Sequence, residues 1–298
     1  MTQEQKYVWL IRTIYDAKEI SLKEISQKWR DDNGFGRDYE LPRATFYRWK
    51  DAIWEQHGIN IVGNQTTKKF SIQNREIIKE GTVIKWMLDT LATGTLINQN
   101  LNMSNRILVN NIPSGSDYLK PIIEAMKKNR KIEIEYRQFG NDYSSTFPIE
   151  PYCVKMFESR WYLLGRNNFG KIRVYSLDRI DDLVTLDETF QLPKDFDAVF
   201  DSHYGIIIGN DIEPQRVVFR AFGMQKEYIK SLPLHESQKL EEDTENYADF
   251  SLYVAPTFDF QQKLLSFGSA VEVIEPVELR NEMKNWIAEM AEIYNRNA

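Results

Sequence analysis

Apolar residues near the start of the chain recur every three or four positions, which is the spacing of an amphipathic helix. Across residues 3–17 these positions are Tyr7, Leu10, Ile11 and Ile14. A second helix is expected across residues 22–32, because Ser21 and Glu24 have the spacing of a capping box ahead of another apolar stripe. The sequence Asn-Gly-Phe-Gly at residues 33–36 is typical of a turn and ends this helix.

A third helix is expected between Pro42 and Gly58, and its first half is rich in groups that can contact DNA. The residues spaced to face inward are Phe46, Trp49 and Ile53. The remaining residues near its start are Arg43, Thr45, Tyr47, Arg48 and Lys50. Arginine can pair with guanine or phosphate, and threonine and tyrosine can donate to phosphate oxygens. This composition is expected at the front of a recognition helix.

Two short apolar segments, residues 59–62 and 69–72, flank a polar turn and predict a β-hairpin. Three helices followed by a hairpin describe a winged helix-turn-helix DNA-binding domain, here residues 1–75. Lys68 and Lys69 of the hairpin complete the predicted DNA-binding set. The alternative is a small helical interaction domain whose surface arginines are only solvated.

The apolar pattern changes after residue 75. Residues 76–117 are interpreted as a helical connector that ends in a break containing Pro, Gly and Ser, and a further helix is expected across residues 118–129. The apolar period then becomes two. Five strands are expected, around residues 131–137, 146–156, 160–166, 171–176 and 180–186. Short strands with tight turns predict a small, strongly bent barrel within residues 118–190.

Alternation along these strands assigns side chains to two faces. The predicted inner residues are Ile132, Ile134, Tyr136, Trp161, Leu163, Ile172 and Val174. The predicted outer residues are Arg137, Arg160, Tyr162, Arg166, Lys171, Arg173 and Tyr175. Guanidinium groups bind phosphate and tyrosine rings stack on bases, so the outer face is interpreted as a binding surface for such groups. An ordinary solvated strand face with cross-strand charge pairs is the alternative.

The last third, residues 191–298, alternates strands and helices in the order β-α-β-β-α-β, followed by one more helix. This order predicts a ferredoxin-like domain, with strands expected at residues 216–222, 234–240, 248–254 and 271–274. The acidic run at residues 241–245 is expected to form a solvated hairpin loop, which argues against DNA binding by this domain. We expect the domain to support dimerisation or to close over a ligand.

Length and charge also distinguish the two ends of the chain. Its 298 residues suggest about two domains, with three small ones as the alternative, and the net charge of −6 hides a gradient. Residues 1–75 carry 13 lysines and arginines against 10 acidic residues, whereas residues 191–298 carry 10 against 19. A mildly basic N-terminal segment permits contact with nucleic acid.

Several other classes of protein are disfavoured by the sequence. No apolar run approaches the roughly 18 residues of a bilayer span, and the start lacks a signal-peptide pattern, so we expect a soluble cytoplasmic protein without a membrane partner. The single cysteine, Cys153, excludes an internal disulfide. The three histidines lack metal-ligand spacing, and no phosphate loop or nucleophile elbow occurs. We therefore expect no metal, no cofactor and no catalysis, with a nucleotide-acting enzyme as a further alternative.

One motif resembles a known family. The run Arg160-Trp161-Tyr162-Leu163, with Pro151 before it and Arg-Val-Tyr-Ser-Leu-Asp-Arg-Ile at residues 173–180, is similar to the signature of the WYL-domain family of bacterial transcriptional regulators. The resemblance implies an α+β multidomain chain with a winged helix-turn-helix, an Sm-like or SH3-like barrel and a C-terminal extension. It also implies that the barrel senses a nucleic-acid fragment or a nucleotide-like ligand and signals to the DNA-binding domain.

The resemblance and the strand geometry together give a predicted ligand-binding set. Family-typical positions are occupied by Tyr136, Trp161, Tyr162, Arg173 and Arg179, although Trp161 is expected to pack in the core. The full predicted set is Tyr136, Arg137, Arg160, Tyr162, Arg166, Arg173, Tyr175 and Arg179. The expected partners are a double-stranded DNA operator, a nucleotide or short oligonucleotide effector, and a second copy of the chain, since two-fold operators favour two recognition helices. An RNA- or single-strand-binding module without operator recognition is the alternative.

Overall fold

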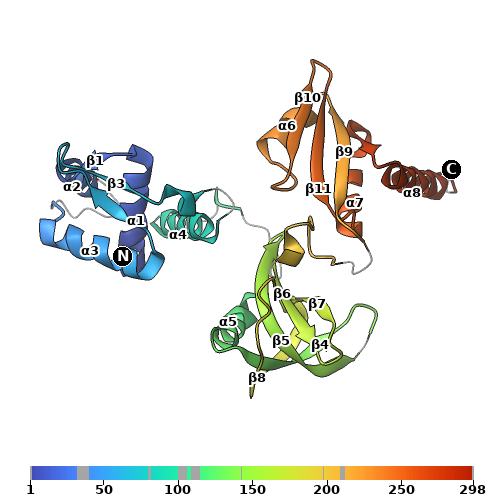
Figure 1. The fold of residues 1–298 in the computed structure, drawn as a ribbon, viewed down its shortest axis with the longest axis horizontal. Coiled ribbons are helices and arrows are strands. Elements are labelled where there is room, and N and C mark those ends of the chain that lie inside the picture. Colours follow the sequence, from blue (N-terminus) through green and yellow to red (C-terminus); the bar gives the residue numbers. More distant parts are fainter. Residues whose placement is uncertain are drawn as a thin grey trace. The chain divides into compact units, whose positions relative to one another are not determined.

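A computed structural model describes residues 2–31, 40–79, 82–99, 106–108, 115–141, 143–196, 198–208 and 212–296. The chain divides into two compact units, residues 1–110 and 111–298 (Figure 1). The turn expected at residues 33–36 and most of the break expected before residue 118 lie outside the described residues.

The N-terminal unit contains three helices and a small antiparallel sheet. The helices are α1 (Gln3–Ala17), α2 (Leu22–Asp31) and α3 (Arg43–His57). The strands are β1 (Ile20–Ser21), β2 (Ile61–Gly63) and β3 (Lys69–Ile72), which pair in the order β1-β3-β2. The three expected helices and the hairpin are confirmed. Strand β1 was not expected, because two residues are too few to show an alternating pattern.

Local sequence sets the ends of α2 and α3. The Ser21 amide donates to Glu24 Oε2 at 2.8 Å, and the Glu24 amide donates to Ser21 Oγ at 3.3 Å, so the expected capping box is present. Pro42 occupies the N-cap of α3, one position before the first helical turn where it was expected. At the other end Gly58 ends α3 in the left-handed conformation, with φ of 64°.

The core of the N-terminal unit lies between these helices and the small sheet. Phe46, Trp49 and Ile53 of α3 are buried, as the helical spacing predicted. After a 3-10 turn (Arg75–Ile78), helix α4 (Val83–Gln99) packs against α1 and buries Leu88 in the same core. The helix expected in the connector is therefore part of the N-terminal core.

The second unit begins with a 3-10 turn (Ser116–Tyr118), helix α5 (Leu119–Lys127) and a five-stranded antiparallel sheet. Its strands are β4 (Arg130–Arg137), β5 (Ser144–Phe157), β6 (Arg160–Asn167), β7 (Ile172–Ser176) and β8 (Ile180–Thr189). They pair in the order β7-β6-β5-β4-β8, so the five expected strands are confirmed. The turn Leu177–Arg179 joins the two edge strands, which requires the sheet to bend back on itself. We call β4 to β8 the curled sheet.

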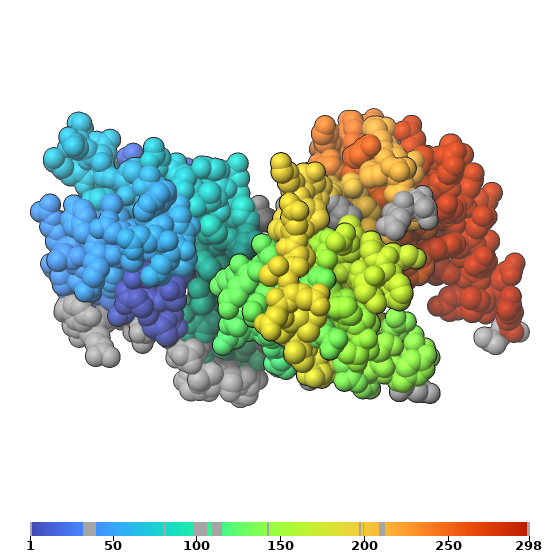
Figure 2. All heavy atoms as spheres, turned by 60° about the horizontal axis from the view of Figure 1, so that its bottom comes forward, coloured from blue at the N-terminus to red at the C-terminus, as the bar shows by residue number. Residues whose placement is uncertain are grey.

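The core of the curled sheet lies against α5 (Figure 1). Ile122 and Ala125 of α5 are buried with Ile132, Ile134 and Leu163 of the strands. Strand β8, yellow in Figure 2, is exposed over most of its length. The curled sheet therefore has one closely packed side and a large exposed surface.

The face assignment of β7 is wrong by one residue. Tyr175 pairs with Leu163 and is buried, although it was expected outside, whereas Ile172 was expected inside and is exposed. The Tyr175 ring lies 5.4 Å from the ring of Tyr136 and 5.7 Å from that of Phe147. An aromatic ring buries more apolar area than a branched aliphatic chain, so the register that buries Tyr175 is favoured.

The C-terminal part of the second unit is a four-stranded antiparallel sheet with three helices. We call these elements the C-terminal sheet and its helices. The elements are β9 (Gln215–Phe222), α6 (Gln225–Ser231), β10 (Lys239–Asp243), β11 (Tyr247–Val254), α7 (Phe258–Leu265), β12 (Val271–Glu275) and α8 (Val277–Asn295), with a 3-10 turn (Gly268–Ala270) before β12. The strands pair in the order β10-β11-β9-β12. The expected succession of strands and helices is present.

Two expectations about β10 are wrong. The strand begins at Lys239 rather than near residue 234, and it contains part of the acidic run that was expected in a loop. Each residue of β10 is exposed, and the strand lies at the edge of the C-terminal sheet. Glu241 pairs with Arg216 at 3.2 Å and Asp243 with Lys230 at 2.6 Å. Charged side chains on an edge strand also discourage pairing with other chains.

The linker between the two sheets contacts both of them. It includes a 3-10 turn (Ala198–Phe200), and the carbonyl oxygen of Ser202 accepts a hydrogen bond from the amide of Ala255 at 2.7 Å. The Tyr204 ring lies 5.6 Å from the ring of Phe157 in β5 and 5.9 Å from that of Phe260 in α7. This aromatic row joins the curled sheet to the C-terminal helices.

In the parts of the chain that are described, no helix is both long and apolar enough to cross a bilayer.

Candidate functional site

A cavity of about 310 Å³ opens on the curled sheet. The predicted ligand-binding residues that line it are Tyr136, Arg160, Tyr162, Arg173 and Arg179. The other lining residues are Phe139, Ile172, Val174, Ser176, Ile206, Ile207 and Ile208. Strands β4, β6 and β7, the turn after β7 and the linker thus contribute to one site. We call it the arginine cavity.

Arg179 is held at the cavity by its backbone and ring contacts. Its Nε donates to the carbonyl oxygen of Arg137 at 2.9 Å. Its guanidinium carbon lies 3.8 Å from the ring centroid of Phe139 and 5.0 Å from that of Tyr136. These cation–π contacts orient the guanidinium plane without neutralising its charge.

Arg160 and Tyr136 are linked through the end of β7. Arg160 Nη1 lies 3.3 Å from Asp178 Oδ2, and Ser176 Oγ donates to the other oxygen of the same carboxylate. The Ser176 amide donates to the phenol oxygen of Tyr136 at 3.2 Å. These contacts fix one basic and one aromatic side chain next to each other.

The two tyrosines of the arginine cavity remain neutral near neutral pH. Burial raises the pKa of Tyr136, and it also raises the pKa of Tyr162, although the charge of Arg160 opposes the second shift. A neutral phenol can donate a hydrogen bond and offers a stacking surface. Arg173 is exposed and donates to the carbonyl of Ile172 at 3.2 Å. The cavity therefore combines cationic groups with aromatic rings.

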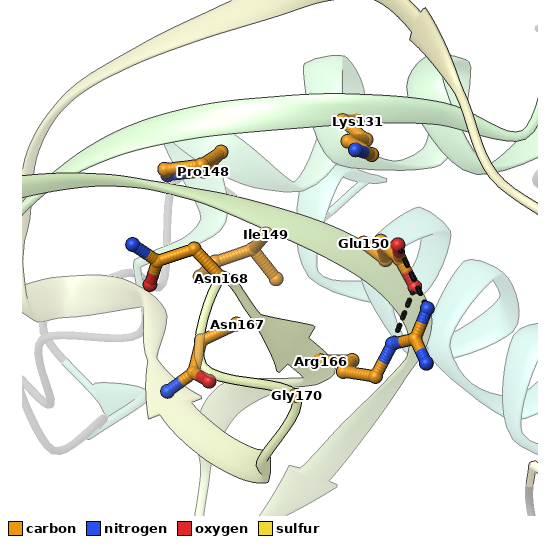
Figure 3. A pocket seen from close by; sticks show the side chains of 8 residues that line it. All are labelled: Lys131, Pro148, Ile149, Glu150, Arg166, Asn167, Asn168 and Gly170. Atoms are coloured by element: carbon orange, nitrogen blue, oxygen red, sulfur yellow. Dashed lines mark hydrogen bonds and ion pairs between the residues drawn. The ribbon is translucent and has the colours of Figure 1, made fainter.

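Three predicted residues lie outside the arginine cavity. Arg137 donates from Nε and Nη2 to Asp181 Oδ2 at 3.2 and 2.8 Å. Tyr175 is buried in the core of the curled sheet. Arg166 is exposed at a different hollow of about 410 Å³, shown in Figure 3.

The hollow in Figure 3 places Arg166 against an acidic partner. Arg166 donates from Nε and Nη2 to the two carboxylate oxygens of Glu150 at 2.9 and 3.1 Å. The hydroxyl of Tyr152 also donates to Glu150, at 3.2 Å. This bidentate pair raises the pKa of Arg166 and compensates its charge. An anionic ligand would have to displace Glu150 to use Arg166 fully.

Sequence reasoning missed Phe139, Ser176 and the three linker isoleucines of the arginine cavity, and it placed Ile172 and Val174 on the inner face. A signal for the isoleucines was present, since Ile206, Ile207 and Ile208 form an apolar run where no strand was expected. Phe139 follows β4 in a turn and gave no comparable signal. Turn residues enter a site through tertiary contacts that alternation does not describe.

The predicted DNA-binding residues gather on α3 and the hairpin. Arg43, Tyr47, Arg48, Lys68 and Lys69 are exposed, and Thr45 and Lys50 are half-buried. The ring of Phe46 contacts that of Phe70 in β3 at 4.6 Å, which fixes α3 beside the hairpin.

The basic groups are confined to the first half of α3. The guanidinium carbon of Arg43 lies 5.6 Å from the ring centroid of Tyr47, whereas Lys50 is paired with Asp51 at 3.2 Å. Asp51 and Glu55 make the second half of α3 more acidic.

Among the residues that the structure describes, no group of three or more histidine, cysteine or acidic side chains is arranged so that it could hold a metal ion.

Two regions of the chain match models of known protein families. A family model described as WYL domain matches residues 117–185, and one described as WCX domain matches residues 213–291. No curated protein matches the sequence at a significant level. The first match contains α5 and most of the curled sheet, and the second contains the C-terminal sheet and most of its helices.

Solved structures show weak overall similarity. Proteasome accessory factor B/C (PafBC) of Arthrobacter aurescens is 15% identical with a TM-score of 0.36, and the match covers 95% of this chain and 46% of that one. A CRISPR Cas-related protein is 15% identical with a TM-score of 0.37, covering 62% of this chain and 54% of the other. This chain spans about half the length of each.

Proposed function

We propose that this protein is a DNA-binding transcriptional regulator whose curled sheet senses a nucleotide or short oligonucleotide. The observation that carries the proposal is the arginine cavity, where Arg160, Arg173 and Arg179 meet Tyr136 and Tyr162. Guanidinium groups bind phosphate, and neutral aromatic rings stack on bases. The WYL match covers the same residues, and WYL-like regulators are expected to sense ligands of this kind.

The size of the arginine cavity supports a small ligand. Its volume of about 310 Å³ lies within the usual range of small-molecule pockets, roughly 300 to 1,000 Å³. Apolar side chains from β7 and the linker line the cavity alongside the arginines. Such a cavity can enclose one nucleotide unit while further units of a strand extend into solvent.

The N-terminal unit would read the operator. In this proposal residues 1–75 are a winged helix-turn-helix, with α3 in the major groove and Lys68 and Lys69 on the backbone. Residues 76–117 connect it to the ligand-sensing barrel of residues 118–190, and residues 191–298 are a ferredoxin-like extension. Two copies would bind a two-fold operator in the cytoplasm.

Binding rather than catalysis fits the ionisable groups of the arginine cavity. Arginines stay protonated, and burial raises the pKa of both tyrosines, so none of these groups is a suitable general base near neutral pH. Asp178, the neighbouring carboxylate, accepts from Ser176 and pairs with Arg160.

A salt-dependent binding assay tests this proposal. Binding of the gene's own promoter duplex should weaken steeply as salt rises, because α3 releases counterions from phosphates. Arg48→Ala should weaken duplex binding and lower the salt slope by about 1, without affecting binding of single-stranded fragments. Arg12→Ala, which removes an exposed arginine of α1, is the matched control and should leave duplex binding unchanged.

Two outcomes would redirect the proposal. Equal loss of duplex and single-strand binding in Arg48→Ala would show that the two sites are not separate. Binding of single strands without any binding of duplex would favour the second candidate, an RNA- or single-strand-binding module. The same arginines and tyrosines support that candidate, since stacking and phosphate contacts do not require a duplex.

A further inference from the structure

Part of the arginine cavity does not belong to the curled sheet. Ile206, Ile207 and Ile208 lie in the linker that follows β8, and they provide much of the apolar lining of the cavity. We call these three residues the isoleucine wall. Their position depends on what holds the linker.

One carboxylate of the C-terminal helices holds the isoleucine wall. Asp259, at the start of α7, accepts the amides of Ile206 and Ile207 through Oδ2 at 2.8 and 3.0 Å. Its other oxygen, Oδ1, accepts the hydroxyl of Thr257 at 2.6 Å and the amide of Phe260 at 3.0 Å. Hydrogen bonds to an ionised carboxylate are among the stronger ones in proteins. Oδ2 of Asp259 thus binds the linker, and Oδ1 binds the start of α7.

The curled sheet holds the same linker from its own side. Lys155 of β5 donates to the carbonyl oxygen of Gly205 at 2.8 Å, and its ammonium lies 4.3 Å from the ring centroid of Phe200. Burial lowers the pKa of Lys155, and the negative charge of Asp259 opposes that shift. The curled sheet therefore binds the linker at the carbonyl of Gly205, directly before the Ile206 amide that Asp259 of α7 accepts.

Gly205 shows how closely the linker is confined. A Cβ atom at this position would lie 2.3 Å from Asp259 Oδ2 and 3.0 Å from Cζ of Phe157. Only glycine allows the backbone to approach the carboxylate this closely. Immediately before it, Tyr204 lies between the rings of Phe157 and Phe260. The linker is therefore fixed at successive residues just before it enters the cavity.

We propose that Asp259 is a positioning residue of the arginine cavity, through which the C-terminal domain sets the isoleucine wall and takes part in ligand binding. The proposal rests on the proposed function in that the cavity is taken to be the ligand site. A ligand that contacts the isoleucine wall is bound more tightly when the linker is held in place. By linkage, ligand binding also stabilises the joint between the curled sheet and α7.

The test compares two alanine variants of the full-length chain. Asp259→Ala removes the acceptor of the Ile206 and Ile207 amides. Glu282→Ala is the matched control, because it also removes a carboxylate bonded to α7, through Gln261 at 2.9 Å, but does not contact the linker. Hydrogen exchange is measured across residues 204–208, together with binding of hexathymidylate followed by fluorescence anisotropy.

In Asp259→Ala, exchange at Ile206 and Ile207 should rise at least fivefold and hexathymidylate binding should weaken at least fivefold. Glu282→Ala should match the wild type in both measurements. Gly205→Ala changes the linker and leaves α7 intact, and it should reproduce both effects of Asp259→Ala. It tests the proposal even if Asp259→Ala does not fold. The proposal would be overturned if residues 206–207 of the Asp259 or Gly205 variant exchanged at the same rate as in the wild type.

The two proposals fail in different ways. If the wild-type chain does not bind hexathymidylate at all, the proposed ligand class is wrong, while the exchange result still decides whether Asp259 positions the isoleucine wall. If exchange rises but binding is unchanged, the wall is positioned by Asp259 without contributing to recognition, and the inference is overturned.

Discussion

The arginines of the curled sheet differ in how each is held. Arg166 forms a bidentate pair with Glu150, whereas Arg173 contacts only a neighbouring carbonyl among the residues described. Both are exposed residues of the curled sheet. An incoming phosphate therefore competes with a carboxylate at Arg166 but not at Arg173. Sequence alone treats these two arginines as equivalent.

This difference predicts that the same substitution weakens binding far more at Arg173 than at Arg166. Arg173→Ala should weaken hexathymidylate binding about tenfold, because one charge-assisted hydrogen bond of roughly 1.5 kcal/mol is lost. Arg166→Ala should change it less than about twofold. Fluorescence anisotropy at one fixed salt concentration measures both. Similar losses in the two variants would mean that the hollow in Figure 3 also binds the strand.

A half-buried histidine, His235, predicts a pH dependence of stability. His235 Nδ1 accepts the Ser237 amide at 3.2 Å, and burial lowers the pKa of His235 below its ordinary 6.5. The folded chain therefore binds fewer protons at this site than the unfolded chain does. Its stabilising contribution is complete above pH 6.5 and is lost as the pH falls towards the lower, folded-state pKa.

Thermal melts at pH 7.5 and pH 5.5 check this sign. The Tm of the wild type should fall more between these values than that of His235→Asn, whose amide can still accept from Ser237 but does not titrate. Carboxylates that titrate at lower pH act on both proteins alike. An identical fall in the two proteins would show that His235 does not drive the loss.

Alternation along the strands brought five of the predicted residues to the candidate site but misplaced the other three. Five of the eight predicted residues meet in the arginine cavity, and the reason the others do not is physical. Tyr175 gains more by joining the rings of Tyr136 and Phe147 than by facing solvent. Arg137 and Arg166 each find a carboxylate on a neighbouring strand. Such pairs depend on strand register, which periodicity leaves open.

Helices and hairpins follow more directly from local sequence. The end of α3 is an example, since Gly58 takes φ of 64° and a side chain there would meet no atom within 4 Å. Strand β1 was missed because its pairing is long-range. It forms only by pairing with residues 69–70 of β3.

Two glycine substitutions should change stability in opposite directions. Gly58→Ala forces alanine into the left-handed region and should destabilise the N-terminal unit by about 1 kcal/mol. Gly94→Ala lies within α4, meets no atom within 4 Å, and should stabilise by roughly 0.5–1 kcal/mol. Urea denaturation followed by circular dichroism gives both values. Two changes of the same sign would contradict the helix-end assignment.

Function at the scale of the whole molecule depends on segments far apart in sequence. Asp259 and Ile206 are separated by 53 residues, and no local pattern announces their contact. The division into a basic N-terminal module and an acidic C-terminal domain was, by contrast, visible in the charge distribution. Composition separates a basic part of the chain from an acidic part, whereas the contacts between the linker and α7 that hold the cavity depend on tertiary structure.

The most direct measurement of regulation is the affinity for promoter duplex with and without saturating hexathymidylate. In the wild type, saturation should change the duplex Kd at least fivefold, which corresponds to a coupling free energy of about 1 kcal/mol. The double variant Arg173→Ala, Arg179→Ala should bind the duplex as the wild type does and show no response. An unchanged wild-type duplex Kd at saturating hexathymidylate, or a full response in the double variant, would contradict control of DNA binding through the arginine cavity.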